Sequence, residues 1–107
     1  INISNQKNVT LVEVSGRIDS SNANQLGEAL SSQIDDGNKQ MVLDLAQVDY
    51  MSSAGLREIV SALKKVRGAG DLRLSQPSVR VREVLEMAGL ETIFQIFESQ
   101  DKALGSY

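Results

Sequence analysis

The 107-residue sequence contains no cysteine, no histidine and no tryptophan, and it has a single proline. Without cysteine there is no disulfide, no thiol nucleophile and no thiolate metal site. Without histidine the chain lacks the commonest general base and the commonest zinc ligand, so a Ser-His-Asp catalytic site is excluded. These absences leave few routes to catalysis by this chain.

Nucleotide and nucleic-acid sites are equally poorly supported. There is no Gly-x-x-x-x-Gly-Lys motif, and Gly68-Ala69-Gly70 follows a predicted helix, where it is typical of a helix stop. Eleven basic against fourteen acidic residues give a net charge of −3, whereas a nucleic-acid surface needs clustered lysine and arginine. We therefore expect no enzyme activity, no cofactor, no bound metal and no nucleic-acid partner.

Hydropathy disfavours a membrane protein. No segment reaches the roughly 18 consecutive apolar residues of a membrane span, and residues 1–8 are polar and alternating, unlike a signal peptide. With 41% hydrophobic and 23% charged residues, the composition is that of a globular protein. We expect one cytoplasmic domain over residues 1–107, with no membrane span of its own.

The first third of the chain predicts a β-hairpin and a helix. Strands at residues 1–3 and 9–14 flank a turn at 6–8, and Gly16 is predicted to end the second strand. Asp19 or Ser20 is expected to cap the following helix. Its apolar face is given by the spacing of Ala23, Leu26, Leu30 and Ile34.

The rest of the chain alternates strands with helices. Strands are expected at residues 41–45, 72–74 and 92–97, with a tight loop at 50–55. Three more helices are expected, and Ser78 and Ser99 are predicted to cap the second and the last of them. The residues predicted to face inward are Leu56, Ile59, Val60, Leu63 and Val66 in the first helix, Val81, Val84, Leu85 and Ala88 in the second, and Ala103 and Leu104 in the last. The order ββαβαβαβα predicts an α/β fold whose sheet is mostly parallel, with helices packed on it. Lys64, Lys65 and Arg67 are expected to complement the dipole of their helix rather than to bind anything.

The segment Met51-Ser52-Ser53-Ala54-Gly55-Leu56 lies at the C-terminal end of the central strand, where sites usually occur in open α/β sheets. In one interpretation Ser52 or Ser53 only caps the next helix and Gly55 permits close packing. In the other, a serine accepts a phosphoryl group, because no histidine or lysine is present there to activate it as a nucleophile. Backbone N–H groups at a helix start stabilise a phosphate.

Three motifs together resemble the STAS domain, and most closely the bacterial anti-sigma-factor antagonists. They are Gly16-Arg17-Ile18-Asp19, the run Val42-Leu43-Asp44-Leu45 followed by Val48–Leu56, and Met87-Ala88-Gly89-Leu90. Each motif is weak alone, but they occur in the family's order over nearly the whole chain. The fold that this resemblance implies is the α/β fold expected above.

The resemblance implies a partner-switching protein. Such an antagonist binds an anti-sigma factor that has a histidine-kinase-like ATPase fold and is also a serine kinase. Phosphorylation by this kinase inactivates the antagonist, and a PP2C-type phosphatase restores it. The family's acceptor lies two residues before the loop glycine, which is Ser53 here, with Ser52 as the second choice.

This chain departs from the family pattern at three positions. Ser52 stands where the family has Asp, Ala54 where Ser or Thr is frequent, and Arg17 where the turn is acidic. The resemblance implies that the phosphorylation loop and the partner contacts are formed by Asp19, Asp49, Met51, Ser52, Ala54, Gly55, Leu56 and Arg57. A role as an accessory STAS subunit of a membrane transporter, or of another signalling complex, is the alternative.

The neighbourhood of Ser53 is expected to be acidic. Asp19 should lie near the loop because its strand neighbours the central one, and Asp44 and Asp49 precede the loop in sequence. Val60 is a further candidate partner contact, but for Leu56 and Val60 the favoured interpretation is that they are core residues. We expect phosphorylation to switch the protein by local charge at an interface, without large refolding.

Overall fold

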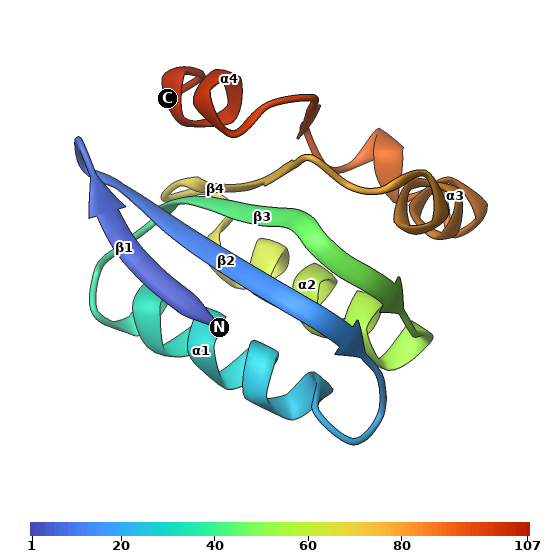
Figure 1. The fold of residues 1–107 in the computed structure, drawn as a ribbon. Helices are drawn as coiled ribbons and strands as arrows, with labels where there is room; N and C mark the ends of the chain where they lie inside the picture. The colour runs from blue at the N-terminus through green and yellow to red at the C-terminus, as the bar shows by residue number, and fades with distance from the viewer.

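The computed structural model describes all 107 residues as a five-stranded sheet in the order β1-β2-β3-β4-β5. Strand β1 is antiparallel to β2, and all other neighbours are parallel. Helices α1 and α2 cover one face and α3 and α4 the other (Figure 1). The elements are β1 (Asn2–Gln6), β2 (Val9–Ile18), α1 (Ala23–Asp35), β3 (Gln40–Met51), α2 (Ser53–Val66), β4 (Asp71–Ser75), α3 (Val79–Met87), the 3₁₀ turn η1 (Leu90–Thr92), β5 (Ile96–Phe97) and α4 (Gln100–Gly105). The predicted α/β class and element order are confirmed.

Strand β2 does not end at Gly16, as the sequence suggested, but continues to Ile18. Gly16 has a φ of +85°, and the register against β3 shifts on both sides of it. At each shift β3 contributes one residue more than β2, so the bulges lie in β3. Gly16 lets β2 follow them, because glycine adopts this backbone conformation without the cost that a Cβ brings. As a result Arg17 and Ile18 lie opposite Tyr50 and Met51 of β3.

Neither Asp19 nor Ser20 caps α1, because the helix begins at Ala23 and the cap residue is Asn22. The Asn22 side chain folds back instead: its Oδ1 accepts from the N–H of Asp19 and its Nδ2 donates to the carbonyl of Arg17. The carboxylate of Asp19 accepts from the N–H and the hydroxyl of Ser21. These bonds hold the turn before α1, and the predicted inward residues of that helix are all buried.

The central strand is longer than predicted. It extends from Gln40 to Met51, so Tyr50 and Met51 are strand residues and not part of a tight loop. The apolar run breaks at the exposed residues Ala46 and Gln47, which is why the sequence suggested an earlier end. Val48 and Met51 are buried again, because the strand stays paired with β2 along its whole second half.

Helix α3 packs beside the part of β3 that has no neighbouring strand on the β4 side. Strand β4 pairs only with residues 40–44 of β3, so the rest of β3 has no strand on that side. Helix α3 contacts β3, and Figure 1 shows it beside the far end of that strand. Val81 and Leu85 of α3 join the main core, whereas Val84 is half-buried and Ala88 is exposed, contrary to prediction.

The strand predicted at residues 92–97 is reduced to Ile96–Phe97. Gly89 ends α3 with a φ of +73°, as its position suggested, but the chain then forms η1 rather than a strand. Ser99 caps α4 as predicted, and the helix buries Ala103 while Leu104 is half-buried. None of the four helices has the length and apolar content that crossing a membrane requires.

Candidate functional site

The candidate site lies where β2 and β3 end together. Ile18 pairs with Met51, and the next residue along, Ser52, donates its N–H to the carbonyl of Ile18 at 2.8 Å. Asp19 therefore begins its turn directly beside the start of α2. The two sequence segments singled out by their motifs, 16–19 and 48–56, are neighbours in space because their strands are hydrogen-bonded partners.

Ser52 is the cap of α2. Its Oγ accepts from the N–H of Gly55 at 3.4 Å, and its carbonyl accepts from the N–H of Leu56 at 3.0 Å. The residue is half-buried, and its backbone is extended, as is usual for a helix cap. Its hydroxyl is thus engaged in holding the helix start.

Ser53 is the first residue of α2, is exposed, and makes no side-chain hydrogen bond. Its hydroxyl therefore stands free at the end of a helix where the first backbone N–H groups lack partners within the helix. Those N–H groups and the helix dipole favour a negative group at this position. Ser52 and Ser53 are adjacent in sequence, but only Ser53 offers an accessible, uncommitted hydroxyl.

Gly55 lets α2 approach the strand ends closely. A Cβ at this position would lie 2.7 Å from Cγ2 of Ile18 and 3.1 Å from Cγ of Met51. Both neighbours are buried and have little room to move. The interpretation that Gly55 permits close packing is confirmed. The lack of a side chain at Gly55 therefore sets how closely the start of α2, which carries Ser53, packs against the sheet.

Two of the proposed contact residues face inward. Met51 is 1% exposed and belongs to the core, so its side chain is not available to a partner, contrary to expectation, and Gly55 is buried too. Asp49 and Arg57 are exposed, whereas Ala54 is half-buried. Met51 and Gly55 support the loop from below, and the exposed residues form its surface.

The charges around Ser53 are more mixed than predicted. The pKa of the Asp19 carboxyl is lowered, first by the hydrogen bonds from Ser21 and then by the positive charge of Arg17. Arg17 places its Nε 3.8 Å from the Asp19 carboxylate and its guanidinium over the ring of Tyr50, 4.4 Å from the centroid. A cation thus lies beside the carboxylate at this edge.

Asp44 does not belong to this neighbourhood, which corrects the prediction. Its side chain is buried in the middle of the sheet and accepts hydrogen bonds from the N–H of Ala46 and from the amides of Gln76 and Gln100. Ser52 lies eight positions farther along the chain, a distance of roughly 25 Å in an extended strand. Asp44 thus links β3 to Gln76, which follows β4, and to Gln100 of α4.

Leu56 and Val60 are only half-buried, so the prediction that they are core residues holds in part. They pack against the core and also line a groove of about 310 Å³ between α2 and the turn after α3. Arg57, Ser61 and Lys64 line it from α2, and Ala88 and Leu90 from the other side. Leu56 and Arg57 of this groove were named as partner contacts from the sequence, but the sequence did not indicate the opposite wall, because Ala88 was expected to face inward.

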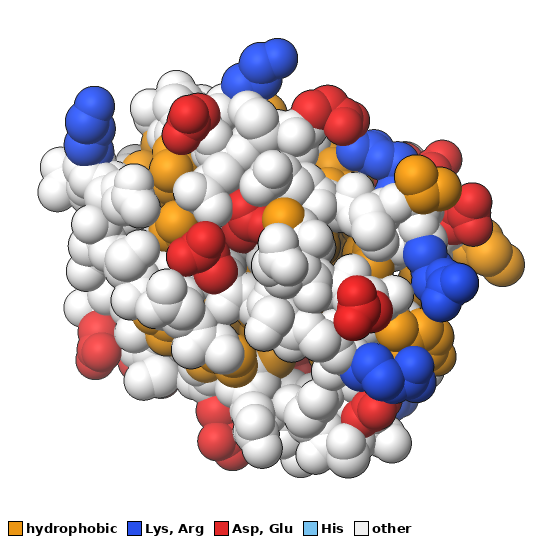
Figure 2. Space-filling view, in the orientation of Figure 1, with side chains coloured by type: hydrophobic (Ala, Val, Ile, Leu, Met, Phe, Trp, Pro, Cys, Tyr) orange, Lys and Arg blue, Asp and Glu red, His pale blue; other side chains and the backbone are white.

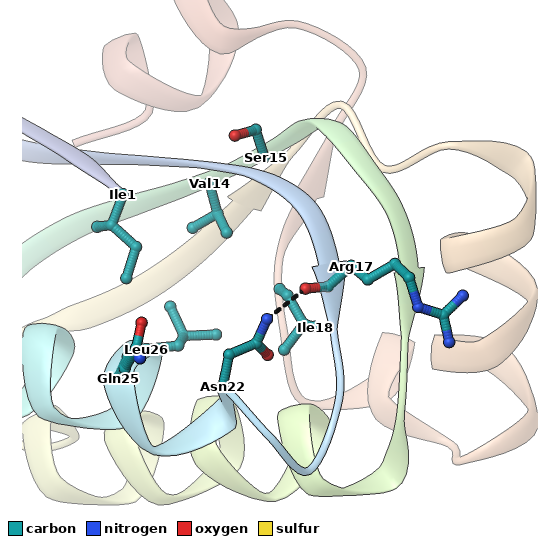
Figure 3. Close-up of a pocket in the computed structure, with 8 residues that line it drawn as sticks. All are labelled: Ile1, Val14, Ser15, Arg17, Ile18, Asn22, Gln25 and Leu26. Atoms are coloured by element: carbon teal, nitrogen blue, oxygen red, sulfur yellow. Dashed lines mark hydrogen bonds between the residues drawn. The ribbon is translucent and has the colours of Figure 1, made fainter.

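A smaller cavity of about 130 Å³ lies between the start of β1, the end of β2 and the first turn of α1. Figure 3 shows the apolar side chains of Ile1, Val14 and Leu26 turned toward one another, with Asn22 and Gln25 from α1. The guanidinium of Arg17 points away from it, so the cavity contains no charged side chain. The sequence did not indicate this cavity, because its walls come from separate segments of the chain.

Comparisons with known proteins show the family of this chain. The family profile described as STAS domain matches residues 1–103. BtrV of Bordetella bronchiseptica, named as an anti-sigma factor antagonist, is 40% identical over 93 residues, which cover 86% of this chain and 80% of BtrV.

Solved structures are similar in fold. A Thermotoga maritima protein described as an anti-sigma factor antagonist has a TM-score of 0.93 at 21% identity, covering 98% of this chain and 92% of that one. The Bacillus antagonist SpoIIAA has been solved in an unphosphorylated form, with a TM-score of 0.83 at 19% identity, covering 96% of this chain and 91% of that one. Its phosphorylated form gives 0.77 at 18% identity, covering 98% and 96%. At these identities the structural likenesses show the shared fold.

Proposed function

The chain belongs to the STAS domain family, and from this premise we propose that it is an anti-sigma factor antagonist that is switched by phosphorylation of Ser53. The single observation that carries the choice of residue is the contrast between the two loop serines. Ser53 is exposed and free of hydrogen bonds at the start of α2, whereas Ser52 is half-buried and caps the helix. The relative BtrV, at 40% identity, is named for the same activity.

In this proposal residues 1–107 act as one domain that performs no chemistry of its own. It binds an anti-sigma factor that is also a serine kinase of the histidine-kinase-like ATPase fold. The kinase transfers the γ-phosphoryl group of ATP to Oγ of Ser53, the hydroxyl proton is lost, and ADP is released. A PP2C-type phosphatase hydrolyses the phosphoserine and restores the free hydroxyl.

The switch works through charge at the interface. A phosphoserine carries about −1.5 to −2 charges at pH 7 and would have to be desolvated under a bound partner. Within the domain the free N–H groups at the start of α2 accommodate it. Because Ser53 is exposed and the Ser52 cap is untouched, the fold remains intact while partner binding is lost.

A phosphorylation assay tests this function. The kinase is first isolated with Ser53→Ala as bait and identified, and is then incubated with ATP and wild type, Ser52→Ala or Ser53→Ala. Wild type and Ser52→Ala should be phosphorylated, Ser53→Ala should not, and Ser53→Asp should bind the kinase more weakly than wild type. Normal phosphorylation of Ser53→Ala, together with full binding by Ser53→Asp, would contradict the proposal. Co-purification with a membrane permease in place of an ATP-binding kinase would favour the transporter-subunit alternative.

A further inference from the structure

The groove between α2 and the turn after α3 has an apolar floor that the fold leaves uncovered. Leu56 and Val60 of α2 and Leu90 of η1 are half-buried and form this floor. Met87, which precedes the lining residue Ala88 in sequence, is 89% exposed, although methionine is usually buried. Figure 2 shows hydrophobic and basic side chains intermixed with some acidic ones on the side of the molecule that carries α3.

Two cations line the groove without partners. Arg57 and Lys64 are exposed, and neither takes part in an ion pair. Being seven residues apart on one helix, they lie on the same face about 10 Å apart along its axis. No carboxylate lines the groove, although the chain as a whole is acidic.

The other cations and the acid of this helix are engaged elsewhere. Lys65 pairs with Asp35 at 2.8 Å and donates to Ser31, so it is committed to α1. Arg67 donates to the carbonyl of Ile93. The Glu58 carboxylate lies against Gly27 of α1, away from the groove. Arg57 and Lys64 are therefore the cations of α2 that remain available to a ligand.

We propose that this groove binds an acidic segment of the anti-sigma factor, with apolar side chains on Leu56 and Val60 and carboxylates on Arg57 and Lys64. This inference rests on the proposed function, whose partner it describes. The groove begins at Leu56, three residues after Ser53 on the same helix, so one partner can cover both the serine and the groove. The charge of the lining selects an acidic occupant, and the apolar floor selects one that carries hydrophobic side chains.

Binding of the purified kinase tests the groove separately from the serine. Its affinity is measured for wild type and for the double variant Arg57→Glu/Lys64→Glu at low and high salt. The matched control is Lys7→Glu/Lys102→Glu, which alters the net charge equally at two exposed residues near α4, away from α2. A third variant, Val60→Thr, removes apolar contact area with little change in shape. Thermal melting confirms that every variant is folded.

The groove variant should bind about tenfold more weakly or worse at low salt, and its affinity should depend less on salt concentration than that of wild type. Val60→Thr should weaken binding with an unchanged salt dependence, and the control should bind like wild type within about twofold. Equal affinities of the groove variant and the control would overturn the groove proposal while leaving the proposed function standing. Failure of the kinase to bind wild type at all would instead overturn the proposed function.

Discussion

At the scale of single residues, Ser52 and Ser53 have different tasks although they are chemically identical. Replacing Ser52 with alanine removes the side-chain acceptor for the N–H of Gly55, and such a cap loss costs about 1 kcal/mol. Ser53→Ala removes no hydrogen bond and should change the free energy of unfolding by less than about 0.5 kcal/mol. Urea denaturation of both variants measures this difference. Equal losses for the two serines would contradict the assignment of the cap to Ser52.

Gly55 determines how closely the start of α2 packs against the ends of β2 and β3. Gly55→Ala brings a Cβ to 2.7 Å from Cγ2 of Ile18, and such overpacking should cost about 1–3 kcal/mol. Gly105→Ala is the matched control, because a Cβ there meets nothing within 4 Å and alanine favours the helix. Chemical denaturation should therefore place the two variants on opposite sides of wild type. A Gly55→Ala variant as stable as wild type would indicate that α2 is free to shift.

Asp19 should titrate below its ordinary value, because the hydroxyl and N–H of Ser21 donate to its carboxylate. Since the pKa is lowered in the folded state, this contribution to stability is present above pH 3.8 and is lost as the pH falls below it. Ser21→Ala should raise the pKa of Asp19 toward 3.8, as followed by carboxylate NMR signals. Ser20→Ala, which alters no bond to Asp19, is the control. An unchanged Asp19 titration in Ser21→Ala would refute the role of the hydroxyl.

At the scale of elements, the backbone conformation of Gly16 lets β2 follow the bulges of β3, and so determines where Asp19 lies. A Cβ at Gly16 would meet no atom within 4 Å, so any cost of substitution comes from its φ of +85° alone. Gly16→Val should therefore lose about 1–2 kcal/mol of stability, and Gly16→Asn less, because asparagine tolerates this conformation better. Thermal or urea unfolding of the pair measures the order. If valine and asparagine are equally tolerated, the backbone conformation is not the constraint.

Periodicity allowed the sequence to predict the buried face of α1 but not the ends of β2 and β3. Helix α1 was predicted from four apolar residues, and all four are buried. The end of β2 was missed because glycine usually stops a strand, whereas here β2 stays paired with β3 on both sides of Gly16. The end of β3 was missed because Ala46 and Gln47 interrupt an apolar run that pairing with β2 continues. Both errors come from long-range pairing, which no local pattern contains.

The candidate site was predictable to a similar degree. The serine loop followed from its position after a buried strand, and the family resemblance selected Ser53. The hydroxyl of Ser53 is free because Ser52 is the residue that caps the helix. The sequence alone could not show which of the two serines is the cap. Asp44 was wrongly placed beside the loop. The two are near in sequence, but the extended strand between them keeps them far apart in space. Leu56 and Arg57 of the groove were named as partner contacts, but the groove itself was missed because its opposite wall comes from a segment about 25 residues farther along the chain.

At the scale of the whole molecule, Tyr107 fastens the C-terminus to the sheet. Its hydroxyl accepts from the N–H of Met41 and lies 2.6 and 2.7 Å from the carbonyl oxygens of Met41 and Asp71, while Arg73 stacks on its ring. Burial raises the pKa of Tyr107 to about 12. One side chain thus joins α4 to the starts of β3 and β4.

This fastening predicts how stability responds to alkaline conditions. The folded-state pKa is raised, so the contribution of the Tyr107 hydroxyl is complete below pH 10 and is lost as the pH rises toward about 12. Tyr107→Phe should cost about 1 kcal/mol at pH 8 and should reduce the decline in stability above pH 10. Urea denaturation at pH 8, 10 and 11 measures both effects. Tyr50→Phe is the control, because the hydroxyl of Tyr50 makes no hydrogen bond. A decline in the stability of Tyr107→Phe above pH 10 that equals the decline of wild type would refute the assignment.

Only Ser52 separates the end of β3 from the start of α2. Ser53 therefore has no hinge and cannot extend into the cleft of a kinase as a flexible substrate peptide does. A kinase acting on it must recognise the folded surface, so a short synthetic peptide that spans the loop should be a poor substrate. Unfolded or newly made chains would then escape modification, and the phosphorylated fraction in a cell would report on folded antagonist alone.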